Sequence, residues 1–245
     1  MKIKIINPDV NEGISVSMKK RAEQFVLSGT EIICNSPSWG VHSVDNVFTW
    51  NIASLSVIDE LIRSEQEEDV DAYVLACFWN PGLYACRELT EKPVIGIGYA
   101  SLLMSQFVGE SAAVICVGES AKYFYREDIA KMGMTNKIAA LKSVDIVAED
   151  SFTRPEYTKG LIIEAAREAV EKDRADVIIL GCGVMAEFSE DVEAAVGVPV
   201  INPLVTGVKV AEAMVSMKLK NNKKGCYKYP VGTELIHIEG RMNTI

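Results

Sequence analysis

Short apolar runs alternate along this chain of 245 residues with segments of helical periodicity. A short run that is apolar on both faces is typical of a strand in a parallel sheet, which helices cover on both sides. Strands that alternate with helices therefore predict the α/β class. The predicted strands are 3–7, 30–35, 71–77, 93–97, 112–117, 137–145, 175–180 and 198–201, and the predicted helices are 15–27, 52–65, 83–90, 120–132, 156–172, 185–196 and 205–217.

The pattern contains an internal repeat. In the first half an apolar run ends at Cys77, and Pro93 follows 16 residues later. In the second half an apolar run ends at Cys182, and Pro199 follows 17 residues later. We therefore predict two pseudo-symmetric lobes, each a parallel sheet flanked by helices, with the active-site cleft between them. The first lobe would comprise 1–97 and a returning helix at 204–217, the second 98–203, and the C-terminal tail 218–245.

Charge and hydropathy exclude several classes of partner. The chain carries 25 Lys and Arg against 34 Asp and Glu, a net charge of -9, which argues against a nucleic-acid partner. No apolar run reaches the roughly 18 residues that a membrane-spanning helix needs. The first six residues are too short and too strand-like for a signal peptide. We expect a cytoplasmic protein with no membrane partner.

Six cysteines and two histidines limit the available chemistry. The cysteines are too sparse for a disulfide scaffold, and no CxxC motif occurs. His42 and His237 lie far apart in sequence and have no metal-ligand spacing, so we predict no metal site. Glycines 96 and 98 lack the third glycine of a dinucleotide motif, and we expect no cofactor. Thiols and carboxylates are the expected proton carriers.

Cys77 and Cys182 end equivalent strands of the repeat. Ligands of parallel α/β sheets bind beyond the carboxyl ends of the strands. Each cysteine leads into a predicted helix, and Pro81 suits the first turn of the helix after Cys77. We expect the positive helix N-terminus to favour the thiolate. If the lobes face each other, one thiolate could remove a proton from a carbon acid while the other thiol protonates the opposite face.

The alternative for both residues is ordinary core packing, the usual role of a cysteine in an apolar run. The duplicated context favours catalysis for this pair. We assign no catalytic role to Cys34, Cys86, Cys116 or Cys226.

Several segments carry a family resemblance: 5–8, 76–83, 87–89, 93–98, 173–185 and 198–201. They include a CFxxPG motif at Cys77 and an LGCxxM motif at Cys182. With them the chain resembles the aspartate/glutamate/hydantoin racemase superfamily, most closely its hydantoin racemase branch. The resemblance spans residues 3 to about 215, and the two motifs together are more specific than either alone.

The resemblance implies a cofactor-independent racemase or epimerase of a hydantoin or amino-acid-like carbon acid, with Cys77 and Cys182 as the acid and base. It implies a small carboxylate or cyclic imide as substrate and a homo-oligomeric assembly. A loop at 98–100 is expected to border the substrate. The residues expected to bind substrate are Asn7, Phe78, Trp79, Asn80, Pro81, Gly82, Tyr99, Gly183, Val184 and Met185.

The chain departs from the hydantoin branch at three places. Asn80 stands where the branch commonly has Asp, and Tyr99 where it often has Glu. Residues 115–118 replace a stretch that usually contains threonines. These changes alter the polar groups that would bind a hydantoin ring. Phe78 and Trp79 would favour a substrate with an apolar or aromatic side chain.

Two other functions fit the same scaffold. One is a decarboxylase or isomerase of small dicarboxylates; the related decarboxylases keep a cysteine on one side only, whereas this chain retains both. The other is a non-catalytic small-molecule binding protein, which the departures at Asn80 and Tyr99 would suit. Release of carbon dioxide would indicate the first, and tight binding without proton exchange the second.

Overall fold

The computed structural model describes residues 1–230. It divides the chain into two compact units. The first contains Met1–Gly96 and the chain from Gly207 onward, and the second contains Ile97–Thr206. The tail predicted at 218–245 is described as far as residue 230, and His237 lies outside the described residues.

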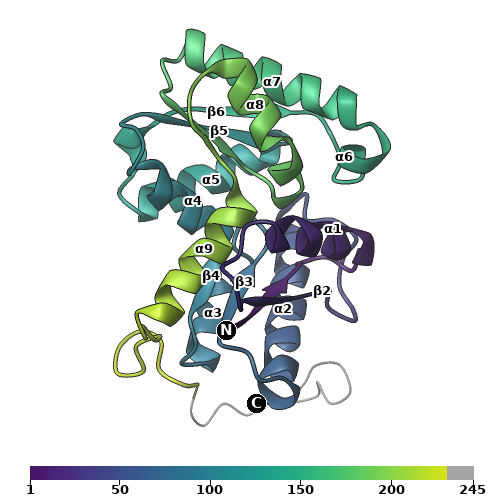
Figure 1. The fold of residues 1–245 in the computed structure, drawn as a ribbon, viewed down its shortest axis with the longest axis vertical. Coiled ribbons are helices and arrows are strands. Elements are labelled where there is room, and N and C mark those ends of the chain that lie inside the picture. The colour runs from purple at the N-terminus through teal and green to yellow at the C-terminus, as the bar shows by residue number, and fades with distance from the viewer. Residues whose placement is uncertain (231–245) are drawn as a thin grey trace. The chain divides into compact units, whose positions relative to one another are not determined.

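The first unit is built on a four-stranded parallel sheet in the order β2-β1-β3-β4 (Figure 1). Strands β1, β3 and β4 are buried along most of their length, as the alternation of runs predicts, whereas β2 at the sheet edge is mostly half-buried. The strands are β1 (Lys2–Ile6), β2 (Glu31–Asn35), β3 (Ala72–Leu75) and β4 (Val94–Gly96). The helices are α1 (Glu12–Glu23), α2 (Val47–Glu67), α3 (Leu83–Leu89) and α9 (Pro203–Ser216), whose first residues belong to the second unit.

Hydrogen bonds fix the helices of the first unit to its sheet. The buried Glu212 carboxylate on α9 accepts from the Leu27 N–H at 2.8 Å and from the Thr30 hydroxyl at 2.7 Å. This joins α9 to the loop between α1 and β2. On α2, Glu60 pairs with the fully buried Lys4 of β1 at 2.8 Å. A charged residue inside a strand is therefore tolerated because α2 supplies its partner.

The second unit repeats this plan with the strand order β6-β5-β7-β8, again all parallel. Figure 1 shows α7 and α8 on one side of this sheet and α4 and α5 on the other. The strands are β5 (Ala112–Val117), β6 (Ile138–Val144), β7 (Val177–Leu180) and β8 (Val200–Ile201). The helices are α4 (Ile97–Ser105), α5 (Glu119–Lys131), α6 (Asp150–Thr153), α7 (Pro155–Glu171) and α8 (Ser189–Val196), with short 3-10 helices η1 (Thr135–Lys137) and η2 (Gly183–Phe188).

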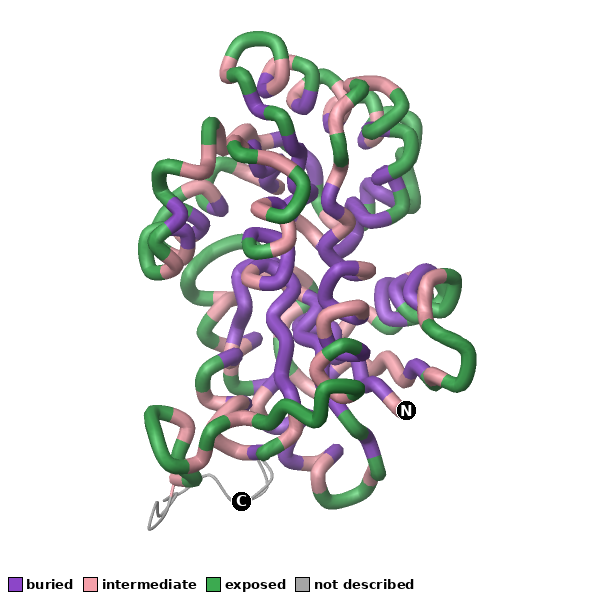
Figure 2. The backbone as a smooth tube through the Cα atoms, turned by 60° about the vertical axis from the view of Figure 1, so that its left-hand side comes forward, coloured by how far each residue is buried: buried purple, intermediate pink, exposed green. Residues whose placement is uncertain are grey.

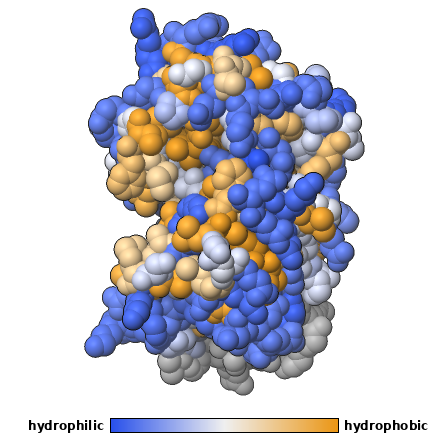
Figure 3. Space-filling view, in the orientation of Figure 1, coloured by the Kyte–Doolittle hydropathy of each residue, from blue (hydrophilic) through white to orange (hydrophobic). Residues whose placement is uncertain are grey.

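Apolar side chains cover one face of the sheet in the second unit. Ile115, Ile178 and Leu180 pack with Ile162 and Ala166 of α7 in one buried cluster. Figure 2 shows the same trend in each unit, with buried residues following the strands and the inner faces of the helices. Figure 3 shows hydrophobic side chains beside charged ones at the surface, an ordinary mixture for a folded chain.

The two sheets have the same order: in each, the first and third strands of the half lie side by side, flanked by the second and fourth. The predicted α/β class with two similar parallel lobes is confirmed. The loop predicted at 98–100 is wrong, because these residues form the first turn of α4. Residues 97–105 are mostly buried and lack the polar face that reveals a helix in sequence. Within the described residues, no helix is both long and apolar enough to cross a membrane.

Candidate active site

Three loops leave the carboxyl edge of the first sheet side by side. Asn7 follows β1, Ser36 follows β2, and Cys77 stands two residues after β3. The hydrogen bonding between the strands continues into these loops: the Asn7 N–H donates to Asn35 O at 3.0 Å, and the Ala76 N–H donates to Ile6 O at 3.0 Å. Since β1 lies between β2 and β3, the sheet brings Asn7 and Cys77 to the same edge.

The Asn7 amide is held in one orientation. It is fully buried, and its Nδ2 group donates to Asp9 Oδ1 at 2.9 Å and to Asn11 O at 3.2 Å. The hydroxyls of Ser15 and Ser36 lie 3.2 Å from the same nitrogen. A carboxylate and a carbonyl can only accept, so the amide cannot be reversed.

This orientation leaves Asn7 Oδ1 as an acceptor. The atom is buried and receives no hydrogen bond from any described residue. A buried acceptor without a donor costs about 1–3 kcal/mol.

A tight turn carries the Cys77 thiol. The Cys77 side chain is partly exposed, and its carbonyl accepts from Asn80 N–H at 3.0 Å. Asn80 has a φ of 52°, and its Nδ2 donates to Phe78 O at 3.0 Å. Asparagine tolerates the left-handed region better than most residues, because its side chain bonds locally. Phe78 and Trp79 are buried, and Trp50 Nε1 donates to the Trp79 carbonyl at 3.1 Å.

Two glycines let this turn pack closely. A Cβ on Gly82 would lie 3.0 Å from Ser54 O of α2, and Gly82 has a φ of 72°. A Cβ on Gly96 would lie 2.1 Å from Asn80 Oδ1. The turn therefore rests directly on the end of β4.

The predicted helix position of Pro81 is wrong. The left-handed residues Asn80 and Gly82 delay the helix, and α3 begins at Leu83 after Gly82. Cys77 stands six residues before Leu83 and does not lie at a helix N-terminus. A stabilising effect of the α3 dipole on a Cys77 thiolate is excluded, because that effect acts only within the first turn.

Cys182 occupies the equivalent position of the second unit, two residues after β7. It is the residue before η2, and its carbonyl accepts from Met185 N–H at 3.1 Å. A Cβ on the preceding Gly181 would lie 2.6 Å from Ile115 O, and the Tyr125 hydroxyl donates to Gly181 O at 2.5 Å. Cys182 is partly exposed, whereas Gly183, Val184 and Met185 are buried. The backbone that presents this thiol is held on both sides.

Tyr125 supports the Cys182 loop through its bond to Gly181, a contact that the sequence analysis did not predict. Ala121, Tyr125 and Ile129 are the buried residues of α5 and recur every four positions. That spacing is a helix-face signal and identifies Tyr125 as facing the sheet. Its partner Gly181 is 56 residues away, so the bond itself has no local sequence signal.

Tyr99 lies on α4 and not in a loop. Its hydroxyl donates to Asp128 Oδ1 of α5 at 3.2 Å. This bond joins two helices of the same unit, so the hydroxyl has a partner that belongs to the fold.

Three of the remaining cysteines are neutral thiols. Burial raises the pKa of Cys34 to about 12, although a hydrogen bond with Ser15 opposes the shift. Burial raises the pKa of Cys86 to about 12 as well, and it raises the pKa of Cys116 further. A buried thiol that keeps its proton cannot act as a base near neutral pH. Cys34, Cys77 and Cys182 are all partly exposed, but Cys34 lies within β2 and keeps its proton. The loops that follow β3 and β7 thus offer Cys77 and Cys182 as the candidate thiols.

This difference predicts an alkylation pattern. At pH 8 a thiol with a pKa of about 12 is only ~10⁻⁴ thiolate, so Cys34 and Cys86 should stay unmodified by iodoacetamide. Cys77, Cys182 and Cys226 should react under the same conditions, as peptide mass spectrometry can show. All six cysteines should react in denaturant. Modification of Cys34 as fast as Cys226 in the folded protein would contradict the prediction.

The comparisons with known proteins bear on both units. The model of the family described as Asp/Glu/Hydantoin racemase matches residues 3–211. The chain belongs to this family.

Similar proteins include hydantoin racemases and an allantoin racemase. A hydantoin racemase from Paenarthrobacter aurescens is 35% identical over 94% of this chain and 98% of its own length. One from Pseudomonas sp. strain NS671 is 34% identical over 96% and 94%. The structure of an allantoin racemase from Klebsiella pneumoniae has a TM-score of 0.92 and 28% identity, and covers 96% of each chain. The predicted enzyme class, an isomerase of the racemase type, is confirmed.

The family match ends at residue 211, so it includes both cysteine loops but not residues 212–230. In the first unit, Asn7 and the expected substrate-binding residues that follow Cys77 lie at one edge of the sheet. In the second unit, the expected substrate-binding residues Gly183, Val184 and Met185 directly follow Cys182. Among residues 1–230, no group of three or more His, Cys, Asp and Glu side chains could hold a metal ion.

Proposed function

We propose that this chain is a cofactor-independent racemase of cyclic ureides of the hydantoin class, in which Cys77 and Cys182 transfer protons on opposite faces of one substrate carbon. The observation that carries the proposal is the repeat: two partly exposed cysteines, Cys77 and Cys182, follow equivalent strands, β3 and β7, of two sheets with the same order. The names of the similar proteins support a hydantoin or allantoin as substrate.

The proposed reaction is balanced with two thiols and no other reagent. The thiolate of one cysteine takes the proton from the ring carbon next to the carbonyl, and the electron pair moves onto the carbonyl oxygen as an enolate. The thiol of the other cysteine then donates its proton to the opposite face and becomes the thiolate. The opposite enantiomer reacts in the reverse direction, which restores the first protonation state.

Asn7 supports a substrate that carries N–H groups. Its Oδ1 is a fixed buried acceptor at the edge that holds Cys77. A hydantoin ring has N–H donors on both sides of a carbonyl, whereas a dicarboxylate ionised at neutral pH has none. Together with the names of the similar proteins, this difference favours a ureide over the dicarboxylate alternatives.

The test is racemisation in heavy water. Single enantiomers of 5-benzylhydantoin and of allantoin are incubated with the protein, and the ring-carbon proton is followed by NMR beside the optical rotation. We expect the rotation to decay to zero as deuterium enters, faster than in buffer alone. Carbon dioxide release from an arylmalonate would indicate a decarboxylase instead. Binding of these ligands without any exchange above the buffer rate would indicate a non-catalytic binding protein.

A further inference from the structure

The C-terminal segment at 218–229, called the strap below, is bonded to the end of α3. Asn221 N–H donates to Glu91 O at 2.8 Å, and Asn221 Nδ2 donates to Thr90 O at 3.0 Å and Lys92 O at 2.6 Å. One side chain and its own backbone thus satisfy three successive carbonyls. The acceptors all lie in the short connection between α3 and β4.

Lys223 continues this contact into the helix itself. Its ammonium donates to Arg87 O at 2.7 Å and Glu88 O at 2.9 Å, carbonyls of the last turn of α3. The last carbonyls of a helix have no partner within the helix and carry partial negative charge, so a cation there is stabilising. Partial burial lowers the pKa of Lys223, although the nearby carboxylates of Glu91 and Glu88 oppose the shift.

Tyr227 adds a third contact on the side of α3. Its ring stacks on Tyr84 with centroids 6.4 Å apart, and its hydroxyl accepts from Arg87 Nη1 at 3.2 Å. Arg87 Nε also donates to Val94 O of β4 at 3.1 Å. The strap, α3 and β4 are therefore tied through one guanidinium.

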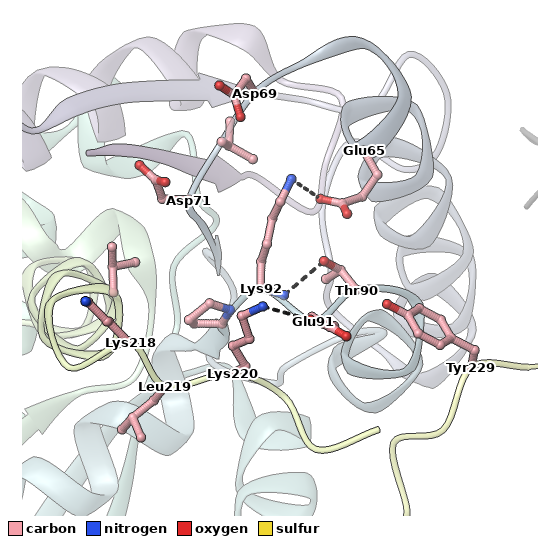
Figure 4. Close-up of a pocket in the computed structure, with 13 residues that line it drawn as sticks. Glu65, Asp69, Asp71, Thr90, Glu91, Lys92, Lys218, Leu219, Lys220 and Tyr229 are labelled. Carbon is pink, nitrogen blue, oxygen red and sulfur yellow. Dashed lines mark hydrogen bonds and ion pairs between the residues drawn. The ribbon is translucent and has the colours of Figure 1, made fainter. Parts of the chain in front are cut away.

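Polar contacts hold the first residues of the strap. A cavity of about 590 Å³ lies between these residues and the connections that lead into β3 and β4, lined in part by Val70, Thr90, Lys218 and Leu219. Figure 4 shows Lys220 reaching across to Glu91, with Asp69 and Asp71 on the far side of the cavity. The bonds of Asn221 and Lys223 thus fix where the strap sits.

Helix α3 needs such support because it has only seven residues and no side-chain N-cap. Isolated helices of this length are not stable in water. Its N-terminal end continues from the turn that carries Cys77, and its C-terminal end is held by the strap. A shift at the C-terminal end of a helix of about two turns is expected to displace its N-terminal end as well.

We propose that the strap positions the Cys77 loop through α3, with Asn221 and Lys223 as positioning residues. The expected effect on racemisation rests on the proposed catalytic role of Cys77. The expected effect on the stability of α3 does not depend on that role. The strap lies beyond residues 3–211, the region of the family match, so the family model does not include its contacts with α3.

The test compares two full-length variants. N221A/K223M removes four side-chain hydrogen bonds to residues 87–92 and keeps the bond from the Asn221 backbone N–H. K224M removes a neighbouring charge whose side chain makes none of these contacts. In hydrogen exchange by mass spectrometry, we expect amides of 80–92 to exchange at least about tenfold faster in N221A/K223M, with β5 and β7 unchanged. K224M should match the parent chain.

Cys182 supplies an internal reference. In N221A/K223M, the pH profile of iodoacetamide labelling should change for Cys77 and stay unchanged for Cys182. A general destabilisation of the fold would change the labelling profiles of both cysteines. We expect kcat for racemisation to fall about tenfold with KM within about twofold. Unchanged exchange at 80–92, or equal changes at both cysteines, would overturn the proposal. If exchange changes but the parent chain racemises no ureide, the strap holds α3 and only the proposed function fails.

Discussion

Replacement of Cys77 or Cys182 by alanine is expected to slow racemisation by about 10³-fold, within the range that general acid–base groups contribute. Each thiol is required once in every turnover, as base in one direction and as acid in the other. Neither loss can be compensated by the other cysteines at the sheet edges, because burial raises the pKa of Cys34 and Cys116 and keeps both protonated. Chiral chromatography of a hydantoin gives the rate directly.

The two variants should also differ from each other. A remaining thiol can still remove and return a proton on its own face, so each variant should exchange deuterium into one enantiomer without inverting it. C77A should label one enantiomer, and C182A the other. C226A is the matched control, because Cys226 is exposed in the strap and should leave the rate unchanged. Full racemisation by either single variant would rule out the two-thiol mechanism.

The fold was predictable because its central strands, β1, β3, β5 and β7, are buried almost throughout. Runs such as 112–117 are apolar throughout and match β5 residue for residue. The repeat of strand, cysteine and proline also predicted two sheets of the same kind. Helix α4 was missed because it follows β4 without a break and is largely buried, so no polar face separates it from the strand before it.

The site was predictable only at its cysteines. The Asn-Pro-Gly sequence after Cys77 indicates a turn, but it does not show that Asn80 and Gly82 are the left-handed residues and that Pro81 stays outside the helix. Asn7 could be placed at a strand end, whereas the fixed direction of its amide depends on Asp9 and two serines brought in by other elements. The strap contacts have no sequence signal, since they join side chains to backbone carbonyls some 130 residues away.

The second large effect is expected from Lys4→Met, on stability. Lys4 is fully buried in β1, and its ammonium lies 2.8 Å from Glu60 of α2 and 2.8 Å from Glu68. Removing one partner of a buried ion pair leaves an uncompensated charge and typically costs about 3–5 kcal/mol. For a chain of this size we expect the Tm to fall by roughly 10 °C.

Lys2→Met is the matched control, because Lys2 lies on the same strand but pairs with the exposed Glu31 at 3.7 Å. Surface pairs of this kind contribute about 0–1 kcal/mol, so its Tm should stay close to that of the parent chain. An equal fall in Tm for Lys4→Met and Lys2→Met would show that Lys4 acts through strand packing and not through its charge.

The pH dependence separates the charge effect from packing. Burial alone would raise the pKa of Glu68, but hydrogen bonds from Lys4 and Ser64 hold it below its ordinary value. A carboxyl with a lowered pKa stabilises the fold above the pKa of the unfolded chain, near 4.3, and loses this contribution as the pH falls through its folded value. Without Lys4, burial should raise the pKa of Glu68 instead. The difference in unfolding free energy between parent and Lys4→Met should therefore be largest near neutral pH and narrow as the pH is lowered below about 4. A difference that stays constant from pH 7 to pH 3.5 in urea unfolding would assign the loss to the missing side-chain volume and exclude the buried ion pair as its source.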